Sequence, residues 1–162
     1  VPVFTSIPGN VDKGALFDLG ANYTEGGRVA GALAARVLAG EDPAAIGVEN
    51  VMPERLLLNP AALEGLRQPW RIPPEIAARA AAKAPTPAPA ALARVWNLHL
   101  IEYVSLFDVA EAEHGIRAGL KEAGLVEGRD FRLSVRNAQA DMPTLSALVD
   151  AAVSDGADML LT

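Results

Sequence analysis

The chain lacks the residues on which several classes of protein depend. Its 162 residues include no cysteine, which excludes disulfides, thiolate metal sites and a cysteine nucleophile. No run of 18 apolar residues occurs, so no transmembrane helix is expected. No signal-peptide pattern is present either, which leaves secretion open if the chain was cut from a longer precursor.

Basic and aromatic residues are scarce. The 14 lysines and arginines are outnumbered by 20 acidic residues, giving a net charge of −6, and no basic cluster offsets this. A phosphate backbone would be repelled, so we expect no nucleic-acid partner. Aromatic residues make up 5% of the chain, yet hydrophobic residues reach 51%. This composition favours a folded core in which alanine-rich helices pack on a sheet.

Motifs for catalysis and cofactor binding are missing as well. No glycine-rich nucleotide loop follows an expected strand, and no nucleophile-elbow motif occurs. Of the two histidines, His99 falls in an expected strand and His114 on the outer part of a helix. Glu111 and His114 form half of a carboxylate-bridged metal motif whose other half is missing. We therefore expect no enzyme activity, no cofactor and no metal site.

What the chain does contain is a proline-rich junction between two segments that each carry α/β patterns. Residues 84–93 include three prolines within five residues, which predicts an extended, semi-rigid linker. The linker separates residues 1–83 from residues 94–162. The sequence thus predicts parts of two domains joined by a spacer.

The first segment predicts short strands around one long helix. The helix begins after Asn22 and ends at Gly40, with an apolar stripe that includes Val29 and Leu33. Gly27-x-x-x-Gly31 on this helix predicts that it lies close against a sheet. Strands are expected at residues 2–5, 15–17 and 55–58, with short helices at residues 61–66 and 75–82.

The second segment has a more regular βαβαβ pattern. Strands are expected at residues 95–101, 131–136 and 157–161. Ser105 is expected to cap the first helix and Asp141 the second, whose inner face would begin at Met142. The middle strand alternates polar and apolar residues, as an edge strand does. This predicts a flavodoxin-like parallel sheet of order 2-1-3, flanked by helices.

Polar side chains follow the ends of the first two strands of this sheet. The first strand is followed by Glu102, Tyr103 and Ser105, and the second by Asn137 and Gln139. Ligands of open parallel sheets bind beyond the carboxyl ends of the strands. These groups suit a small zwitterion with an apolar body. The alternative is that they are turn and cap residues, because loops are generally polar.

Two long stretches resemble one protein family. Gly115–Met142 resembles the first βαβ unit of ABC-transporter substrate-binding proteins of the tryptophan/tyrosine type, and Asp155–Thr162 continues the match. Residues 1–83, with PVFTS, GALFDLGANYTEGG, LLLNPAALEGL and IPPEIAARA, resemble that family's C-terminal part. The resemblance implies a type I periplasmic-binding-protein fold, an extracytoplasmic location, an ABC permease as partner, and an aromatic amino acid or similar small molecule as ligand.

The resemblance also implies ligand-binding positions in this sequence. Tyr103 matches an aromatic position, Asn137 and Gln139 match an NAQ motif, and Tyr23 matches the tyrosine of a DY pair. Glu102 and Ser105 stand where members usually have glutamine and glutamate, and Ala140 replaces the glycine after NAQ. Ser6 follows the first strand, but Ile7-Pro8 replaces the polar residues that members have there.

The stretch that resembles the C-terminal part of the family comes before the stretch that resembles its N-terminal part, so the order is tail before head. The parent is therefore expected to hold tandem binding domains, of which this chain spans the junction, with circular permutation as the alternative. The isolated chain is expected to reassemble its segments into one mixed sheet or to form a strand-swapped homodimer. A sensory ligand-binding region fused to a signalling domain is the alternative function.

Overall fold

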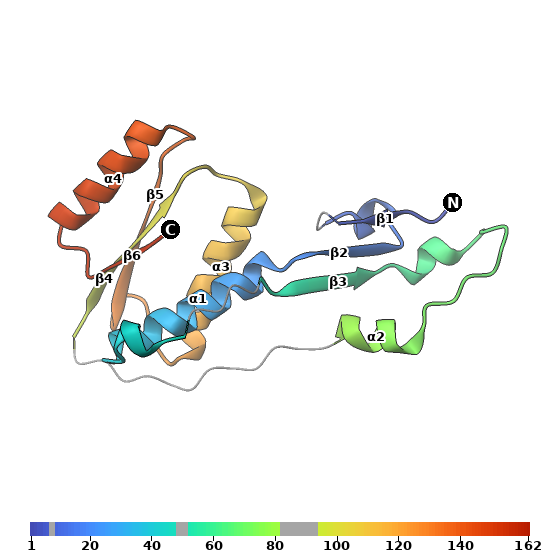
Figure 1. Ribbon diagram of the computed structural model, residues 1–162, viewed down its shortest axis with the longest axis horizontal. Helices are drawn as coiled ribbons and strands as arrows, with labels where there is room; N and C mark the ends of the chain where they lie inside the picture. The colour runs from blue at the N-terminus through green and yellow to red at the C-terminus, as the bar shows by residue number, and fades with distance from the viewer. Residues whose placement is uncertain (7–8, 48–51, 82–93) are drawn as a thin grey trace. The chain divides into compact units, whose positions relative to one another are not determined.

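A computed structural model describes residues 1–6, 9–47, 52–81 and 94–162 (Figure 1). The chain divides into two compact units, the first made of residues 1–22 and 50–85 and the second of residues 23–49 and 86–162. The second unit thus combines a helix of the first sequence segment with the described part of the second segment. The linker predicted at residues 84–93 lies outside the described residues.

The first unit contains a three-stranded mixed sheet. Its strands are β1 (Phe4–Thr5), β2 (Phe17–Ala21) and β3 (Glu54–Leu58), in the order β1-β2-β3. β2 runs parallel to β1 and antiparallel to β3. The strand expected at residues 15–17 begins only at Phe17 and continues through Gly20, because pairing with β3 outweighs the low strand propensity of glycine.

Two short helical turns and one helix accompany this sheet in the first unit. The turns are η1 (Val11–Lys13) and η3 (Pro60–Leu63), whereas a further turn, η2 (Pro43–Ala45), belongs to the second unit. η3 replaces the helix expected at residues 61–66. The helix α2 (Pro74–Ala81) forms as predicted and contacts β3.

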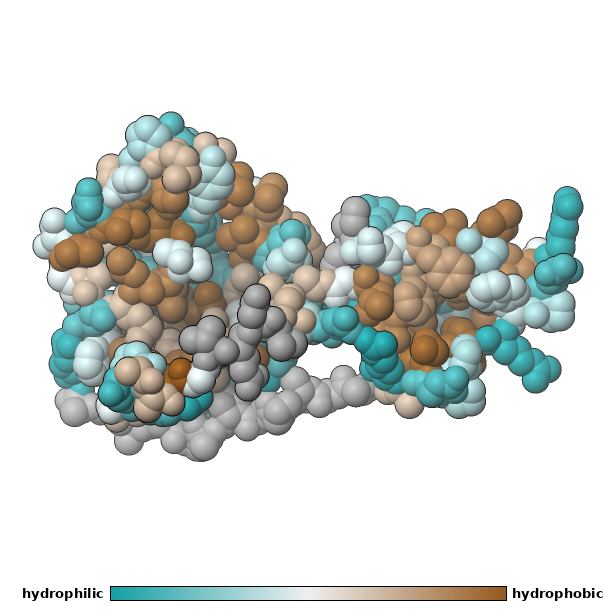
Figure 2. Space-filling model, in the orientation of Figure 1, coloured by the Kyte–Doolittle hydropathy of each residue, from teal (hydrophilic) through white to brown (hydrophobic). Residues whose placement is uncertain are grey.

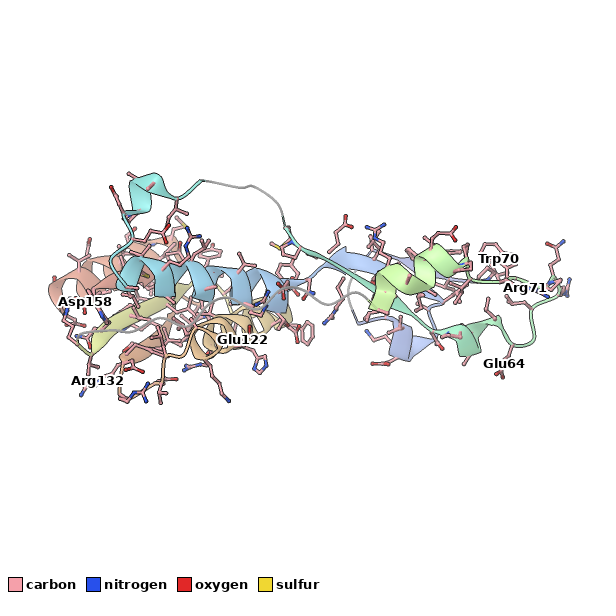
Figure 3. The ribbon with its side chains drawn as sticks, turned by 90° about the horizontal axis from the view of Figure 1, so that it is seen from below. Glu64, Trp70, Arg71, Glu122, Arg132 and Asp158 are labelled. Atoms are coloured by element: carbon pink, nitrogen blue, oxygen red, sulfur yellow. The ribbon has the colours of Figure 1, made fainter. Side chains whose placement is uncertain are left out.

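Aromatic rings and one buried carboxylate characterise the first unit. The Phe4 ring packs on those of Phe17 and Trp70, with centroids 5.8 and 5.7 Å apart (Figure 3). Asp18 in β2 is only 1% exposed, and its Oδ2 accepts a hydrogen bond from the Asn10 backbone N–H at 3.1 Å. No pattern in the sequence indicated that this carboxylate would be buried.

The second unit contains a parallel sheet covered by helices on both faces. Its strands are β4 (Trp96–Glu102), β5 (Phe131–Asn137) and β6 (Met159–Leu161), in the order β5-β4-β6. The helices α1 (Tyr23–Leu38) and α3 (Phe107–Glu122) cover one face, and α4 (Met142–Ser154) covers the other (Figure 1). The predicted order, with the alternating strand at the edge, is confirmed, and so is the predicted α/β fold class.

The core of the second unit lies between its sheet and the α1–α3 pair. Leu98 and Leu100 of β4 pack there against Ile116 and Leu120 of α3. Met142, predicted to point inward, is 58% exposed because it occupies the first position of α4, where the helix has just begun. Apolar surface remains visible on each unit in Figure 2.

Glycines allow α1 and α3 to touch backbone to backbone. A methyl group at Gly27 of α1 would lie 2.0 Å from the carbonyl oxygen of Ala112, and one at Gly115 of α3 would lie 2.0 Å from that of Thr24. Gly31 and Gly119 make equally close approaches one turn further on. The prediction that the Gly27–Gly31 pair packs on a sheet is therefore wrong, because its partner is another helix with the same spacing of glycines.

The side of α1 that faces the core consists of small residues. Its buried positions are Gly27, Gly31, Ala34, Ala35 and Leu38. Val29, which the sequence assigned to the inner stripe, is 42% exposed. The close contact with α3 leaves no room for larger side chains at the seam, so the small residues face inward instead.

Polar contacts flank the seam between α1 and α3. The Arg28 guanidinium donates hydrogen bonds to Glu25 on its own helix and to Glu122 on α3, the latter at 2.9 Å (Figure 3). These carboxylates raise the pKa of Arg28 above its usual value. Thr24 donates a hydrogen bond to Glu111 of α3. Because Glu122 is partly exposed, we expect its ion pair with Arg28 to add little stability. Its main effect is expected to be on the register of α1 against α3.

Asp158 fastens β6 to β4. Its Oδ2 accepts a hydrogen bond from the Asn97 backbone N–H at 2.8 Å, and its Oδ1 accepts one from Arg94 Nη2 at 2.6 Å (Figure 3). The Arg94 guanidinium also lies 3.8 Å from the centre of the Trp96 ring. The Asn97 hydrogen bond, followed by the Arg94 contact, lowers the pKa of Asp158 below its ordinary value of 3.8.

Candidate functional site

The polar residues at the ends of β4 and β5 form one hydrogen-bonded cluster. Glu102 and Asn137 are register partners in the parallel pair, so both side chains emerge at the same edge of the sheet. Asn137 Nδ2 donates to Glu102 Oε2 at 2.9 Å and to Ser105 Oγ at 2.9 Å. An amide nitrogen carries two hydrogens, so both donors of Asn137 are used within the cluster. The Glu102 carboxylate is thereby held in a fixed position.

The loop after β5 adopts an unusual backbone conformation. Gln139 and Ala140 have φ angles of 53° and 63°, in the left-handed region that disfavours side chains. Asn137 Oδ1 accepts a hydrogen bond from the Gln139 N–H at 2.7 Å. Such strained backbone persists where the surrounding contacts fix it.

Tyr103 provides further contacts that fix this loop. Its backbone carbonyl accepts a hydrogen bond from the Ala140 N–H at 2.7 Å, and its hydroxyl donates to the Ala140 carbonyl at 2.8 Å. The loops after β4 and β5 are thus tied together. The left-handed conformation also gives a physical reason for the glycine that the NAQ motif carries at the position of Ala140.

A pocket of about 230 Å³ lies beside this cluster, within the second unit. Its rim carries Tyr23, Glu102, Tyr103 and two acidic residues of α3, Asp108 and Glu113. The rest of its lining is mostly apolar and consists of Leu100, Ile101, Val109, Ala112, Ile116 and Thr162. An apolar floor with a few convergent polar groups is typical of a small-molecule site, and the volume suits a small ligand or one part of a larger one.

The charges at this pocket are predominantly negative. Glu113 accepts hydrogen bonds from Arg117, at 3.0 Å from Nη2, and Arg117 also pairs with Glu127. Both carboxylates raise the pKa of Arg117 above its usual value, and the hydrogen bond to Glu127 has the larger effect. Among the described residues that line the pocket there is no lysine or arginine. The lining of the pocket therefore presents carboxylates to a ligand and contributes no positively charged side chain.

Most of the sequence-predicted site residues lie together in the second unit. Tyr23, Glu102 and Tyr103 line the pocket, while Asn137 donates hydrogen bonds to both Glu102 and Ser105. Gln139 lies in the strained loop after β5 and is exposed. Ser6 belongs to the first unit, where it directly follows β1 and is exposed.

Sequence reasoning misplaced one cap and missed two site residues. The N-cap of α3 is Leu106, without a side-chain cap, because the Ser105 hydroxyl is used by Asn137. Asp141 does cap α4, through Thr144 N–H at 2.7 Å. Asp108 and Glu113 were not predicted at the site. The spacings of four residues from Asp108 to Ala112 and from Val109 to Glu113 were a signal for a shared helix face.

The two residues of the half metal motif on α3 have different surroundings. Glu111 accepts a hydrogen bond from Thr24, and His114 is exposed. Within the described ranges, no group of three or more histidine, aspartate or glutamate side chains is arranged to hold a metal ion. In the same part of the chain, no helix has both the length and the apolar character needed to cross a membrane.

Two further hollows lie in the first unit. One, of about 640 Å³, is lined by Val1, Pro2, Trp70 and residues 65–68. The other, of about 180 Å³, is lined mostly by apolar residues, among them Phe4, Phe17 and Trp70. Neither contains a carboxylate in its lining. Compared with these two hollows, the pocket beside Glu102 is therefore the better candidate for a ligand with a positively charged group.

Comparison with known proteins identifies one family. Residues 1–83 match the model of a family described as ABC transporter substrate binding protein. No curated protein matches the chain, and no solved structure does. The matched residues include β1 to β3, α1 and α2.

Proposed function

Because the chain belongs to the family of ABC transporter substrate-binding proteins, we propose that the pocket beside Tyr103 binds the transported solute and that this solute is a small amine with an apolar or aromatic body, such as an aromatic amino acid. Family membership supports a solute-binding rather than a catalytic role, with an ABC permease as partner and an extracytoplasmic location.

The observation that carries the proposal is the fixed carboxylate at the rim of an apolar pocket. Glu102 is held by Asn137 and can accept a hydrogen bond from a ligand ammonium. Charge-assisted hydrogen bonds of this kind contribute about 1.5–3 kcal/mol. The apolar floor would receive the body of the ligand, and Tyr103 and Tyr23 would contact it from the rim.

The order of the sequence segments supports a second proposal, on domain organisation. We infer that residues 1–83 and 94–162 derive from successive copies of one binding domain. The tail-before-head order and the proline-rich linker support this. The packing of α1, from the first segment, on α3, from the second, is equally compatible with a permuted domain. A further copy of the Gly115–Met142 motif in the parent reading frame would support the tandem, and its absence would favour a permuted domain.

A thermal-shift panel on the whole chain tests the ligand proposal. Tyrosine, tryptophan and phenylalanine, with their decarboxylated counterparts, are titrated at pH 7. At least one is expected to raise the melting temperature in a saturable way, because it binds only the folded state. Glu102→Gln is expected to weaken this ligand by about tenfold or more, which corresponds to the lost charge-assisted hydrogen bond.

Matched variants make the panel specific to the pocket. Tyr103→Ala removes a rim residue and is expected to weaken binding, whereas Glu64→Gln, an exposed residue of the first unit, is expected to leave it unchanged (Figure 3). Saturable shifts that survive both Glu102→Gln and Tyr103→Ala would contradict the assignment of the pocket. The lack of a shift with every compound would contradict the proposed function.

A further inference from the structure

We propose that the pocket of the second unit selects organic amines that lack a carboxylate over the corresponding amino-acid zwitterions. This inference rests on the proposed function, because it names the ligand class of the same pocket. It follows from where the charges of the pocket lie and from which hydrogen-bond donors are already used.

The charge on the pocket lining is negative. Glu102, Asp108 and Glu113 all contribute to the lining, and of these Glu113 is paired with Arg117. The hydrogen bond from the Asn137 amide fixes Glu102 but leaves its charge in place. An ammonium group placed among these residues is attracted, whereas a carboxylate is repelled by like charge.

The side-chain donors of Asn137 and Tyr103 are already used within the protein. Both hydrogens of Asn137 Nδ2 are donated, one to Glu102 and one to Ser105. The hydroxyl of Tyr103 donates to the Ala140 carbonyl at 2.8 Å. To receive a hydrogen bond from Asn137 or Tyr103, the carboxylate of a zwitterion would have to displace one of these existing bonds. Otherwise it would bind without a hydrogen bond from either side chain, and both outcomes lower the affinity.

The two tyrosines favour a cation for a separate reason. Aromatic rings attract cations through the negative charge of their faces, and the effect increases when water is excluded. Tyr23 and Tyr103 both line the pocket, and the Tyr103 ring is fixed by its hydroxyl contact. The apolar residues between them, including Val109 and Ile116, provide a surface for the hydrocarbon part of an amine.

Matched pairs of compounds test the preference directly. Calorimetric titrations of the whole chain at pH 7 compare tyramine with tyrosine, tryptamine with tryptophan, and phenethylamine with phenylalanine. Each pair differs only in the carboxylate. We expect the amine of at least one pair to bind ten times or more tightly than its amino acid, and amine affinity to fall as salt is added, because the attraction is electrostatic.

Charge-removing variants link the preference to named residues. Glu102→Gln is expected to weaken the amine by about tenfold and to narrow the difference between amine and amino acid. Asp108→Asn, which removes a second carboxylate from the lining, is expected to act in the same direction and provides the test if the first variant fails to fold. Glu64→Gln, outside the pocket, is expected to leave the affinity for both the amine and the amino acid unchanged.

The outcomes distinguish this inference from the function on which it rests. Amino acids that bind as tightly as their amines, or more tightly, would overturn the preference while leaving a solute-binding role intact. A preference that persists in both Glu102→Gln and Asp108→Asn would overturn its assignment to this pocket. If neither member of any pair binds, both the preference and the proposed function fail.

Discussion

Replacing Ala140 with glycine is expected to stabilise the protein. Ala140 has a φ of 63° and follows Gln139 at 53°, so two consecutive side chains occupy the left-handed region. An L-residue pays about 1–2 kcal/mol for that conformation, whereas glycine adopts it freely. Glycine also adds about 0.4–1 kcal/mol of disorder to the unfolded chain. The difference leaves a net stabilisation of about 0.5–1 kcal/mol.

The contacts of the loop do not oppose this change. The hydrogen bonds of Ala140, to the carbonyl and hydroxyl of Tyr103, use its backbone alone and survive in Ala140→Gly. The loop should therefore keep its shape while losing its strain. Denaturant unfolding followed by circular dichroism measures the gain, which corresponds to a rise of roughly 2–4 °C in melting temperature.

The same substitution on a helix provides the control. Ala110 is exposed in α3, where glycine is expected to cost about 0.5–1 kcal/mol relative to alanine. Ala110→Gly and Ala140→Gly should thus shift stability in opposite directions. If Ala140→Gly is neutral or destabilising like Ala110→Gly, the argument that a strained backbone joins the two site loops is refuted.

Two further predictions concern the second unit. Gly115→Ala should destabilise it by about 1–3 kcal/mol, because the new methyl group meets the Thr24 carbonyl oxygen of α1, whereas Gly47→Ala, in open space, should be nearly neutral in the same denaturant titration. Asp158, whose pKa is lowered by the Asn97 N–H and then by Arg94, should contribute stability that is present above its unfolded value of 3.8 and lost as the pH falls through its lower folded pKa. The Asp158→Asn variant should therefore lose less stability than the unsubstituted protein as the pH falls below about 4, as measured by unfolding across a pH series. The same pH dependence in both proteins would contradict this.

The sheet of the second unit could be predicted because its strands carry distinct patterns. The alternation from Phe131 to Arg136 indicated one covered face, and this strand is indeed at the edge. The same parallel arrangement predicted that the ends of β4 and β5 would meet, as Glu102 and Asn137 do. Periodicity and strand direction are local properties, and they were sufficient here.

The helix pairing and the details of the site could not be predicted in this way. Gly27 and Gly31 indicate that something approaches closely, but not whether it is a strand or a helix. The clue lay in the same spacing at Gly115 and Gly119, far along the chain. Likewise, Asn137 could have offered its amide to a ligand, and only the structure shows that Glu102 and Ser105 use both hydrogens. Such choices depend on tertiary neighbours rather than on local sequence.

The glycine seam has a consequence for how the chain is made. α1 ends at Leu38 and its partner begins at Phe107, so α1 leaves the ribosome before its binding surface has been translated. At about 5–20 residues per second, the delay is on the order of 4–14 s. A helix with three glycines and little apolar surface is not expected to persist alone during that time. The nascent segment must therefore stay soluble without its partner. The small residues on its inner face, among which Leu38 is the one large apolar side chain, suit it to that delay.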